Sequence, residues 1–268
     1  MTIDVIPIYI ATAAAVVVTV VAVAFRLLTL PAAITAAVML VASAVFWGYT
    51  GFAVYAIPFL LNGALGAIGK KKRKEREQKL HEHSGRRGLK QVLVNGGPAL
   101  IIMCIAFFTR LDALYAAAVA ALAEAFADSE AGDFGMAFGG KTVNILTFKS
   151  AEKGLSGGVS AEGSVASVIA AAIVAAIPVA FCAYDGAVFG AVAAGAVLGV
   201  ITDSVLGASV QALYRCPECK TLTEKKFCCR RTQLIRGSER LNNDAVNIIS
   251  SLAGAVLGGG FAALALYL

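Results

Sequence analysis

The sequence has little charge and almost no histidine. Charged residues make up 15% of the 268 residues, whereas a soluble domain carries about 25%. Hydrophobic residues make up 59%. These values exclude an ordinary soluble protein and predict an all-α, polytopic bundle of transmembrane helices. The chain has two histidines, both outside its apolar stretches, which excludes chemistry that needs a histidine base inside the membrane.

The first apolar stretch is not preceded by the basic residues that begin a secretory signal peptide. It is also too long for the apolar part of such a signal, so we expect it to be a transmembrane helix. Apolar stretches near the spanning length of about 20 residues recur along the chain. We predict eight: Val5–Phe25, Leu28–Val45, Gly48–Ile68, Gln91–Thr109, Leu111–Phe126, Gly163–Ala183, Gly186–Gln211 and Asn243–Leu266. Seven remain an alternative, because the second and fifth stretches are short and the second and third almost touch.

This pattern predicts three parts of the chain. Residues 1–69 hold three transmembrane helices, and residues 70–90 form a basic cytoplasmic segment whose interleaved Lys and Glu predict a solvated helix over 70–82. Residues 91–268 form a catalytic transmembrane domain with a glycine-rich loop at 129–162 and a cysteine-containing loop at 212–242. Cytoplasmic loops are expected to form the site.

The basic residues predict the orientation. Every Lys and Arg except Arg110 falls on one side of an eight-span arrangement. By the positive-inside rule that side is cytoplasmic, and both termini lie outside. The net charge of +6 therefore reflects topology, and no nucleic-acid partner is expected. The absence of a presequence favours a prokaryotic plasma membrane, with the site facing the cytoplasm.

Polar residues inside the apolar stretches are costly and therefore informative. They occur four apart at the ends of four predicted helices: Gln91 and Asn95, Glu124 and Asp128, Asp203, Gly207 and Gln211, and Asn243 and Asn247. Residues four apart share a helix face, and all four faces lie at one depth. The pattern predicts one shared site, the alternative being hydrogen bonds that only hold helices together.

The stretch "AFADSEAGDFG" adds a cluster of carboxylates, Asp128, Glu130 and Asp133, and a glycine-rich stretch with lysines follows it. Carboxylates suit Mg²⁺, while glycine N–H groups and lysines suit phosphate oxygens. We interpret the combination as a site for a metal–polyphosphate substrate. The alternative is a flexible, solvated loop.

One segment, "GMAFGGKT" at 135–142, matches the P-loop pattern. A P-loop follows a buried strand and opens a helix of an α/β domain. Here the pattern follows a membrane span, and we therefore favour a chance match, although Lys141 can still contact phosphate without that fold.

Four cysteines gather in the second loop: Cys216, Cys219, Cys228 and Cys229. This spacing suits a structural, tetrahedral zinc site. Because adjacent cysteines rarely bind one ion together, His81, His83 or a water is an alternative ligand. The remaining alternative is a reduced loop without metal.

Arg86 and Arg87 stand directly before a span that begins with Gln91 and Asn95. They are well placed to hold an anionic headgroup, the alternative being charges that only set topology.

The ordered motifs "RRGLKQVLVNG", "AFADSEAGDFG", "TFKSAEKGLSGGVSAEGSVAS", "DSVLGASVQ", "CPEC" and "NNDAVN" resemble an integral-membrane family. That family includes plant phytyl-phosphate kinase and animal transmembrane protein 19. The resemblance covers residues 86–255 and is specific as a set. It implies transfer of a phosphoryl group from a nucleoside triphosphate, typically CTP, to an isoprenyl monophosphate such as phytyl or geranylgeranyl phosphate.

The resemblance also implies site residues. The first family motif falls on Ala127, Asp128, Ser129, Gly132, Asp133 and Gly135, with Ser129 and Asp133 replacing the family's Thr and Glu, and Gly132 its Ser. The glycine-rich motif falls on Gly154, Gly157, Gly158, Val159 and Ser160, and the third on Asp203, Ser204, Gly207 and Ala208.

Together the residues and the resemblance predict a kinase mechanism. Asp128, Asp133 and Asp203 hold Mg²⁺. The nucleotide phosphates contact the glycine-rich loop with Ser156, the hydroxyls of Ser129 and Ser204, and either Lys141 or Lys149. The acceptor phosphate contacts Arg86, Arg87, Asn95, Asn243 and Asn247. A phosphate acceptor needs no base, whereas an alcohol acceptor would use Glu124 or Asp128.

Three alternatives remain at this point. A cytidylyltransferase that forms a CDP-lipid would use the same groups, and a polyprenol kinase would use an alcohol acceptor. A lipid or ion transporter should carry polar residues through the middle of the bilayer, often in paired repeats, and the sequence shows neither. A homo-oligomer is compatible with the sequence.

Overall fold

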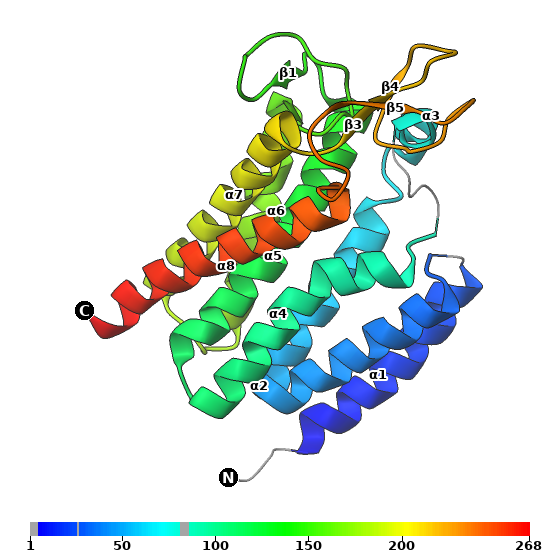
Figure 1. The fold of residues 1–268 in the computed structure, drawn as a ribbon. Coiled ribbons are helices and arrows are strands. Elements are labelled where there is room, and N and C mark those ends of the chain that lie inside the picture. Colours follow the sequence, from blue (N-terminus) through cyan, green and yellow to red (C-terminus); the bar gives the residue numbers. More distant parts are fainter. Residues whose placement is uncertain (1–4, 26, 81–85) are drawn as a thin grey trace.

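The chain folds into one bundle of long helices. The computed structural model describes residues 5–25, 27–80 and 86–268. The helices are α1 (Val5–Ala24), α2 (Leu30–Leu65), α3 (Lys70–Leu80), α4 (Leu89–Thr109), α5 (Asp112–Phe138), α6 (Ala161–Ala180), α7 (Gly186–Ser209) and α8 (Asn243–Tyr267). All but α3 run side by side (Figure 1). The predicted all-α bundle of a polytopic membrane protein is confirmed.

The number of membrane-length helices is close to the prediction of seven or eight. Six helices in the described ranges are long and apolar enough to cross a bilayer, namely α1, α2, α4, α6, α7 and α8. The helix α5 has 27 residues and is rich in alanine, but it carries five acidic residues. Large apolar side chains such as Val20, Phe108 and Val256 are exposed on the outer faces, as expected for helices in contact with lipid.

The helix α2 comprises two legs that fold back on each other. The helix is interrupted at Trp47 and Gly48, and Gly48 has a φ of 58°, a left-handed conformation that glycine adopts at no steric cost. Met39 precedes this turn in the sequence and Tyr55 follows it, but both side chains contact the same residue, Gly96 of α4. A Cβ built on Gly96 would be 3.0 Å from the Met39 sulfur and 3.6 Å from the Tyr55 ring. In a straight helix Met39 and Tyr55 would be about 24 Å apart. The two legs match the second and third predicted spans.

Small residues allow α5, α7 and α8 to pack closely. A Cβ on Gly195 of α7 would lie 2.3 Å from the Cα of Gly258 of α8. A Cβ on Gly258 would lie 2.5 Å from Ala120 of α5. Glycines spaced four apart on both α7 and α8 (Gly195 and Gly199, Gly254 and Gly258) therefore bring the three backbones together, as small residues do in membrane bundles.

One end of the bundle carries the longer connections, α3 and most of the basic residues, and we name it the basic end (Figure 1). Between α5 and α6, β1 (Val143–Asn144) pairs with β2 (Gly158–Val159). Between α7 and α8, β3 (Leu213–Arg215), β4 (Leu222–Thr223) and β5 (Gln233–Arg236) form an antiparallel sheet in the order β4-β3-β5.

One predicted boundary was wrong. The fifth span was expected to end at Phe126, but α5 continues to Phe138, so the glycine-rich loop begins at residue 139 rather than 129. The extension is stabilised by α6, because a Cβ on Gly163 would lie 2.8 Å from the carbonyl oxygen of Ala131. The carboxylates of "AFADSEAGDFG" therefore lie on a helix and not in a solvated loop. The predicted helix over 70–82 is present as α3 up to Leu80, and its last two residues lie outside the described ranges.

Candidate functional site

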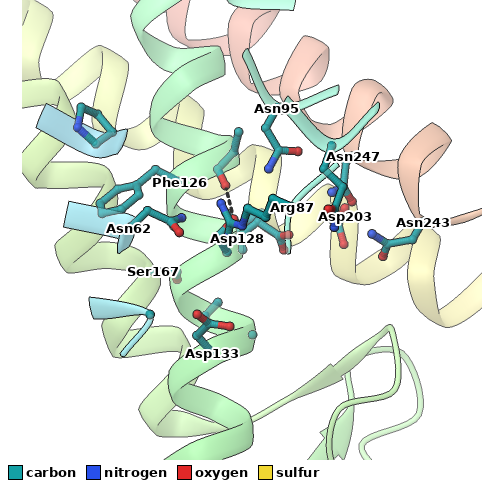
Figure 2. Close-up of a pocket in the computed structure, with 18 of the residues that line it drawn as sticks. Asn62, Arg87, Asn95, Phe126, Asp128, Asp133, Ser167, Asp203, Asn243 and Asn247 are labelled. Carbon is teal, nitrogen blue, oxygen red and sulfur yellow. Dashed lines mark hydrogen bonds between the residues drawn. The ribbon is translucent and has the colours of Figure 1, made fainter. Parts of the chain in front are cut away.

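A cavity of about 1590 Å³ opens at the basic end and extends between the helices. Most of the predicted site residues line it. They are Arg86, Arg87, Asn95, Asp128, Ser129, Asp133, Gly154, Ser156, Gly157, Gly158, Ser160, Asp203, Ser204, Asn243 and Asn247. The topology thus brings the predicted polar helix ends to one place, and Figure 2 shows several of these side chains around the cavity.

Asp128 and Asp203 form the acidic centre of the cavity. They come from α5 and α7 and interact electrostatically. Asp203 is 9% exposed, and one of its oxygens accepts a hydrogen bond of 3.2 Å from Ser250 of α8. The amide oxygen of Asn247, one turn before Ser250, is buried and has no hydrogen-bond partner among the described residues. Two carboxylates and an amide oxygen therefore converge from three helices.

Glu124 lies behind this centre and does not line the cavity. Its side chain is 1% exposed and packs between α7 and α8, since Cβ atoms on Gly199 and Gly254 would lie 2.5 Å and 3.3 Å from it. Its position does not support the role of a base toward an alcohol acceptor.

Asp133 lies apart from Asp128 and Asp203, further along α5 (Figure 2). Its carboxylate is 3.0 Å from the guanidinium of Arg73 on α3, and both side chains are largely buried. The same guanidinium donates to the carbonyl oxygens of Gly66 and Ile68 at 2.6 and 3.3 Å. Through Arg73, Asp133 therefore links α5 to α3 and to the residues that follow α2. Its expected place beside Asp128 and Asp203 as a metal ligand is not supported by this position.

Backbone hydrogen bonds hold the segment that carries Arg87 in place at the cavity. Arg87 donates from its N–H to the carbonyl oxygen of Leu27 at 3.0 Å, and its own carbonyl accepts from Thr29 at 3.1 Å. The segment before α4 is thereby tied to the turn between α1 and α2. Figure 2 shows the Arg87 side chain beside Asp128, with Asn95 and Asn247 nearby.

The glycine-rich loop is held against α7. Gly154 and Gly157 have φ values of 94° and 84°, and a Cβ on Gly157 would lie 2.4 Å from the backbone of Ala208. The N–H of Ser156 donates to Glu224, which directly follows β4, at 3.0 Å, and the Ser156 hydroxyl accepts from Gln211 at 2.8 Å. Side chains from two other segments thus fix this loop at the cavity wall.

Two of the three lysines in this loop do not reach the cavity. Lys141 and Lys149 are exposed and are not among its lining residues, whereas Lys153 is. For Lys149 the reason is local, because the Asn144 side chain accepts hydrogen bonds from the N–H groups of Leu146 and Thr147, both at 3.0 Å. This closes a tight turn that carries Lys149 away from the cavity. Lys153 instead donates to the carbonyl oxygen of Gly139.

The P-loop pattern at 135–142 does not have the structural context of a P-loop. Its first four residues are the end of α5, and the segment is followed by β1 rather than by a helix. The interpretation as a chance match is supported.

The inner part of the cavity is apolar. It is lined by Val17, Val18 and Val21 of α1, by Met39, Phe52 and Phe59 of the two legs of α2, and by Phe126 of α5. Helices of the N-terminal part therefore form a chamber that continues directly from the polar end.

The structure also brings the four loop cysteines together. Their sulfur atoms all lie within 4.8 Å of one another. Backbone hydrogen bonds, that of Cys219 first, lower the pKa of the Cys216 thiol to about 6, whereas contact with the Cys219 thiol raises the pKa of Cys229 to about 12. The alternative ligands His81 and His83 lie outside the described residues.

Sequence reasoning missed three residues that position the site: Arg73, Lys153 and Glu224. Arg73 stands in a run of lysines that indicates only topology, and nothing local marks it as buried. Lys153 was counted with the basic residues of the loop but was not chosen. Glu224 carries a weak signal, because it is an isolated acid beside two lysines in a basic segment.

Comparisons with known proteins agree with the helical architecture. No curated protein and no solved structure matches the chain. A family profile described as "Integral membrane protein DUF92" matches residues 13–255. This range includes most of α1, all of α2 to α7 and the first half of α8. The chain therefore belongs to the DUF92 family of integral membrane proteins.

Proposed function

We propose that this protein is a membrane-embedded kinase that transfers a phosphoryl group from a nucleoside triphosphate to an isoprenyl monophosphate. The observation that carries the proposal is the shape of the cavity. One continuous space joins an end with carboxylates, arginines and a glycine-rich loop to an apolar chamber between α1, α2 and α5. Such a space suits a substrate with an anionic head and a long apolar tail.

The acceptor's position follows from this polarity. Arg86 and Arg87 offer guanidinium groups that match phosphate oxygens in pairs, and Asn95 adds an amide beside them. The isoprenoid tail would extend from there between the legs of α2 and α1. Asn243 and Asn247, which the sequence also predicted as contacts of the acceptor phosphate, line the same cavity.

The nucleotide's phosphates would lie at the glycine-rich loop and the start of α6. Ser160 caps α6 by accepting from the N–H of Gly163, and Ser160, Gly163 and Ser164 line the cavity. A helix N-terminus and the N–H groups of a glycine-rich loop both favour anions. CTP is the nucleotide that the family resemblance suggests.

The donor set at the acidic centre fits Mg²⁺. Carboxylate and amide oxygens are ligands that this ion prefers, and the buried amide oxygen of Asn247 lacks another partner among the described residues. We therefore assign Asp128, Asp203 and Asn247 as its ligands, in place of the set with Asp133. The bound ion would neutralise charge on the nucleotide's phosphates.

The chemical step needs no general base. An oxygen of the acceptor phosphate, ionised near neutral pH because its second pKa is about 6, forms a bond to the γ-phosphorus. The bond from that phosphorus to the bridging oxygen breaks, and the nucleoside diphosphate leaves with the electron pair. The protein contributes orientation and positive charge, which are the main sources of catalysis in phosphoryl transfer. We place the basic end in the cytoplasm, where nucleotides are present.

Product analysis tests the proposal against its alternatives. Purified protein in detergent with Mg²⁺ receives labelled geranylgeranyl or phytyl monophosphate and each of CTP, UTP, GTP and ATP in turn. A lipid diphosphate with release of nucleoside diphosphate supports the kinase. A CDP-lipid with release of pyrophosphate would assign a cytidylyltransferase, and phosphorylation of a free polyprenol alone would assign a polyprenol kinase. No product from folded protein with any nucleotide would contradict an enzyme of this class.

A further inference from the structure

The four cysteines of the segment between α7 and α8 have the spacing of a metal site. The Cys219 and Cys228 sulfur atoms are 3.8 Å apart, and those of Cys228 and Cys229 are 3.9 Å apart. In a tetrahedral zinc–thiolate site with Zn–S bonds of about 2.3 Å, neighbouring sulfur atoms lie about 3.8 Å apart. A disulfide would require about 2.0 Å. We propose that Cys216, Cys219, Cys228 and Cys229 bind one structural Zn²⁺.

Two backbone turns present these thiols to one another. In the first turn, the N–H of Lys220 donates to the carbonyl of Cys216, and the N–H of Cys216 donates to the carbonyl of Thr221, both at 3.0 Å. Lys220 adopts a left-handed φ of 61°, which closes the turn. In the second, the N–H of Cys228 donates to the carbonyl of Arg230 at 3.0 Å. Adjacent cysteines can therefore both face the ion, because this tight turn spreads their side chains.

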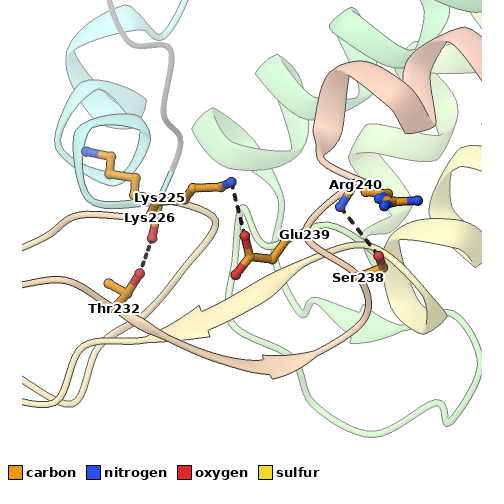
Figure 3. A network of polar contacts seen from close by, with 6 residues as sticks. All are labelled: Lys225, Lys226, Thr232, Ser238, Glu239 and Arg240. Carbon is orange, nitrogen blue, oxygen red and sulfur yellow. Dashed lines mark hydrogen bonds and ion pairs between the residues drawn. The ribbon is translucent and has the colours of Figure 1, made fainter.

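The second turn is fixed at its base, as Figure 3 shows. The Thr232 hydroxyl donates to the carbonyl of Lys225 at 2.7 Å, and its N–H donates to the carbonyl of Lys226 at 3.1 Å. The Lys226 ammonium contacts Glu239 at 3.3 Å. The hairpin that carries Cys228 and Cys229 is therefore shaped before an ion arrives.

The sheet next to the cysteines is small and buries few large apolar side chains of its own, Tyr214 being one. Its strands have two to four residues, and Phe227, Leu234 and Ile235 around it are exposed. Small sheets without an apolar core usually need a metal or disulfides. A zinc ion would supply the missing cross-link between the two turns.

The charge around the site suits a thiolate cluster. Four thiols that bind Zn²⁺ release four protons and give a site of net charge −2. Basic side chains surround these cysteines in the sequence: Arg215, Lys220, Lys225, Lys226, Arg230 and Arg231. The guanidinium of Arg230 pairs with Glu218 at 3.1 Å, which links the two turns on their outer side.

The site has a consequence for the cavity. The strand β4 lies between the two pairs of cysteines, and Glu224 at its end holds Ser156 of the glycine-rich loop. The N–H of Glu224 also donates to the carbonyl of Leu80 at the end of α3 at 2.9 Å. Zinc bound outside the cavity would therefore stabilise the glycine-rich loop and α3. This effect does not depend on which reaction the protein catalyses.

The experiment measures metal directly, without an activity assay. Wild-type protein, expressed in zinc-supplemented medium and freed of its affinity tag, is analysed for zinc and iron by elemental mass spectrometry. Variants Cys216→Ser, Cys219→Ser, Cys228→Ser and Cys229→Ser are compared with Cys104→Ser, whose thiol lies in α4. Hydrogen exchange of residues 154–160 is measured before and after chelation of the wild type.

We expect one zinc per wild-type and Cys104→Ser chain, and a loss of at least about fivefold in the loop variants. Chelation should increase exchange in residues 154–160 and in α3, with little change in α7. Replacement of the ion by Co²⁺ in the wild type should produce the visible spectrum of a tetrahedral thiolate site, a readout that does not depend on the variants folding. Wild-type protein with no zinc, with iron instead, or with disulfides among these cysteines would overturn the proposal.

Discussion

Replacement of Asp133 by asparagine should destabilise the protein rather than remove a metal ligand. The carboxylate is 3.0 Å from the Arg73 guanidinium, and the two side chains are 16% and 8% exposed. At an effective dielectric constant near 20, two unit charges at this distance attract by about 5.5 kcal/mol. Loss of one partner of a buried pair typically costs about 3–5 kcal/mol, because the other charge stays buried. Arg73 keeps its bonds to Gly66 and Ile68, so we expect about 3 kcal/mol.

A double-mutant cycle measures this pair. Asp133→Asn, Arg73→Gln and the double variant are unfolded in SDS and followed by circular dichroism. The double variant should be destabilised by less than the sum of the single variants. The exposed pair Lys226–Glu239, at 3.3 Å, is the matched control and should contribute less than about 1 kcal/mol. The reasoning is refuted if Asp133→Asn keeps full stability and loses Mg²⁺-dependent activity, because Asp133 would then be a ligand as the sequence predicted.

Three further variants test the loop and the chamber. Gly157→Ala should lower kcat/KM about 100-fold through displacement of the glycine-rich loop, whereas Gly97→Ala, with open space around its Cβ position, should keep activity; equal activities would contradict the assigned role of the loop. Glu224→Ala should raise the nucleotide KM about tenfold, because the loop serine loses its charged acceptor; an unchanged KM would separate this contact from nucleotide binding. Val18→Trp should raise the KM for a long-chain isoprenyl phosphate and not for a short one, since Val18 lines the chamber, while Val20→Trp on the outer face of α1 should raise neither. A uniform loss with both chain lengths would argue against a tail site there.

The sequence predicted that the polar ends of several helices lie close together, because the membrane supplies a strong constraint. Polar residues are rare in apolar helices, and those at the same end of several helices must lie at the same depth. Asp128, Asp203 and Asn247 were placed near one another for this reason, although they are far apart in the chain. Their roles were not all predicted as proposed here, because Asp133 was expected as the third metal ligand and Asn247 as a contact of the acceptor phosphate. The glycines spaced four apart in α7 and α8 would likewise have predicted that these two helices pack closely, a prediction that the sequence analysis did not make.

The loop contacts could not be predicted in the same way. Lys141, Lys149 and Lys153 have the same chemistry, yet only Lys153 lines the cavity, and a turn closed by the Asn144 side chain directs Lys149 away from it. The role of Arg73 depends on where α3 lies relative to α5, which no local pattern indicates. The boundary of α5 was missed because hydropathy falls at its carboxylates, whereas packing against α6 continues the helix by twelve residues, to Phe138.

The apolar chamber also required the structure. The family resemblance noted in the sequence begins at residue 86, and the apolar residues of the N-terminal part were sufficiently explained by membrane insertion. The turn at Gly48 returns the second leg of α2 beside the first, and the space between these legs, α1 and α5 becomes the inner cavity. We therefore expect the side chains of α1 and α2 that line this chamber to contact the tail of the substrate.

The most direct test is transfer of the γ-phosphoryl group to geranylgeranyl monophosphate, measured with γ-labelled nucleotide and purified protein. The comparison is between wild type, Asp128→Asn and Asp112→Asn, which removes a carboxylate from the opposite end of the same helix. We predict labelled lipid diphosphate from the wild type and from Asp112→Asn, and a decrease of at least about 100-fold for Asp128→Asn with unchanged folding. Transfer by Asp128→Asn at the wild-type rate, or no labelled lipid from folded wild-type protein with any of the four nucleotides, would contradict the account.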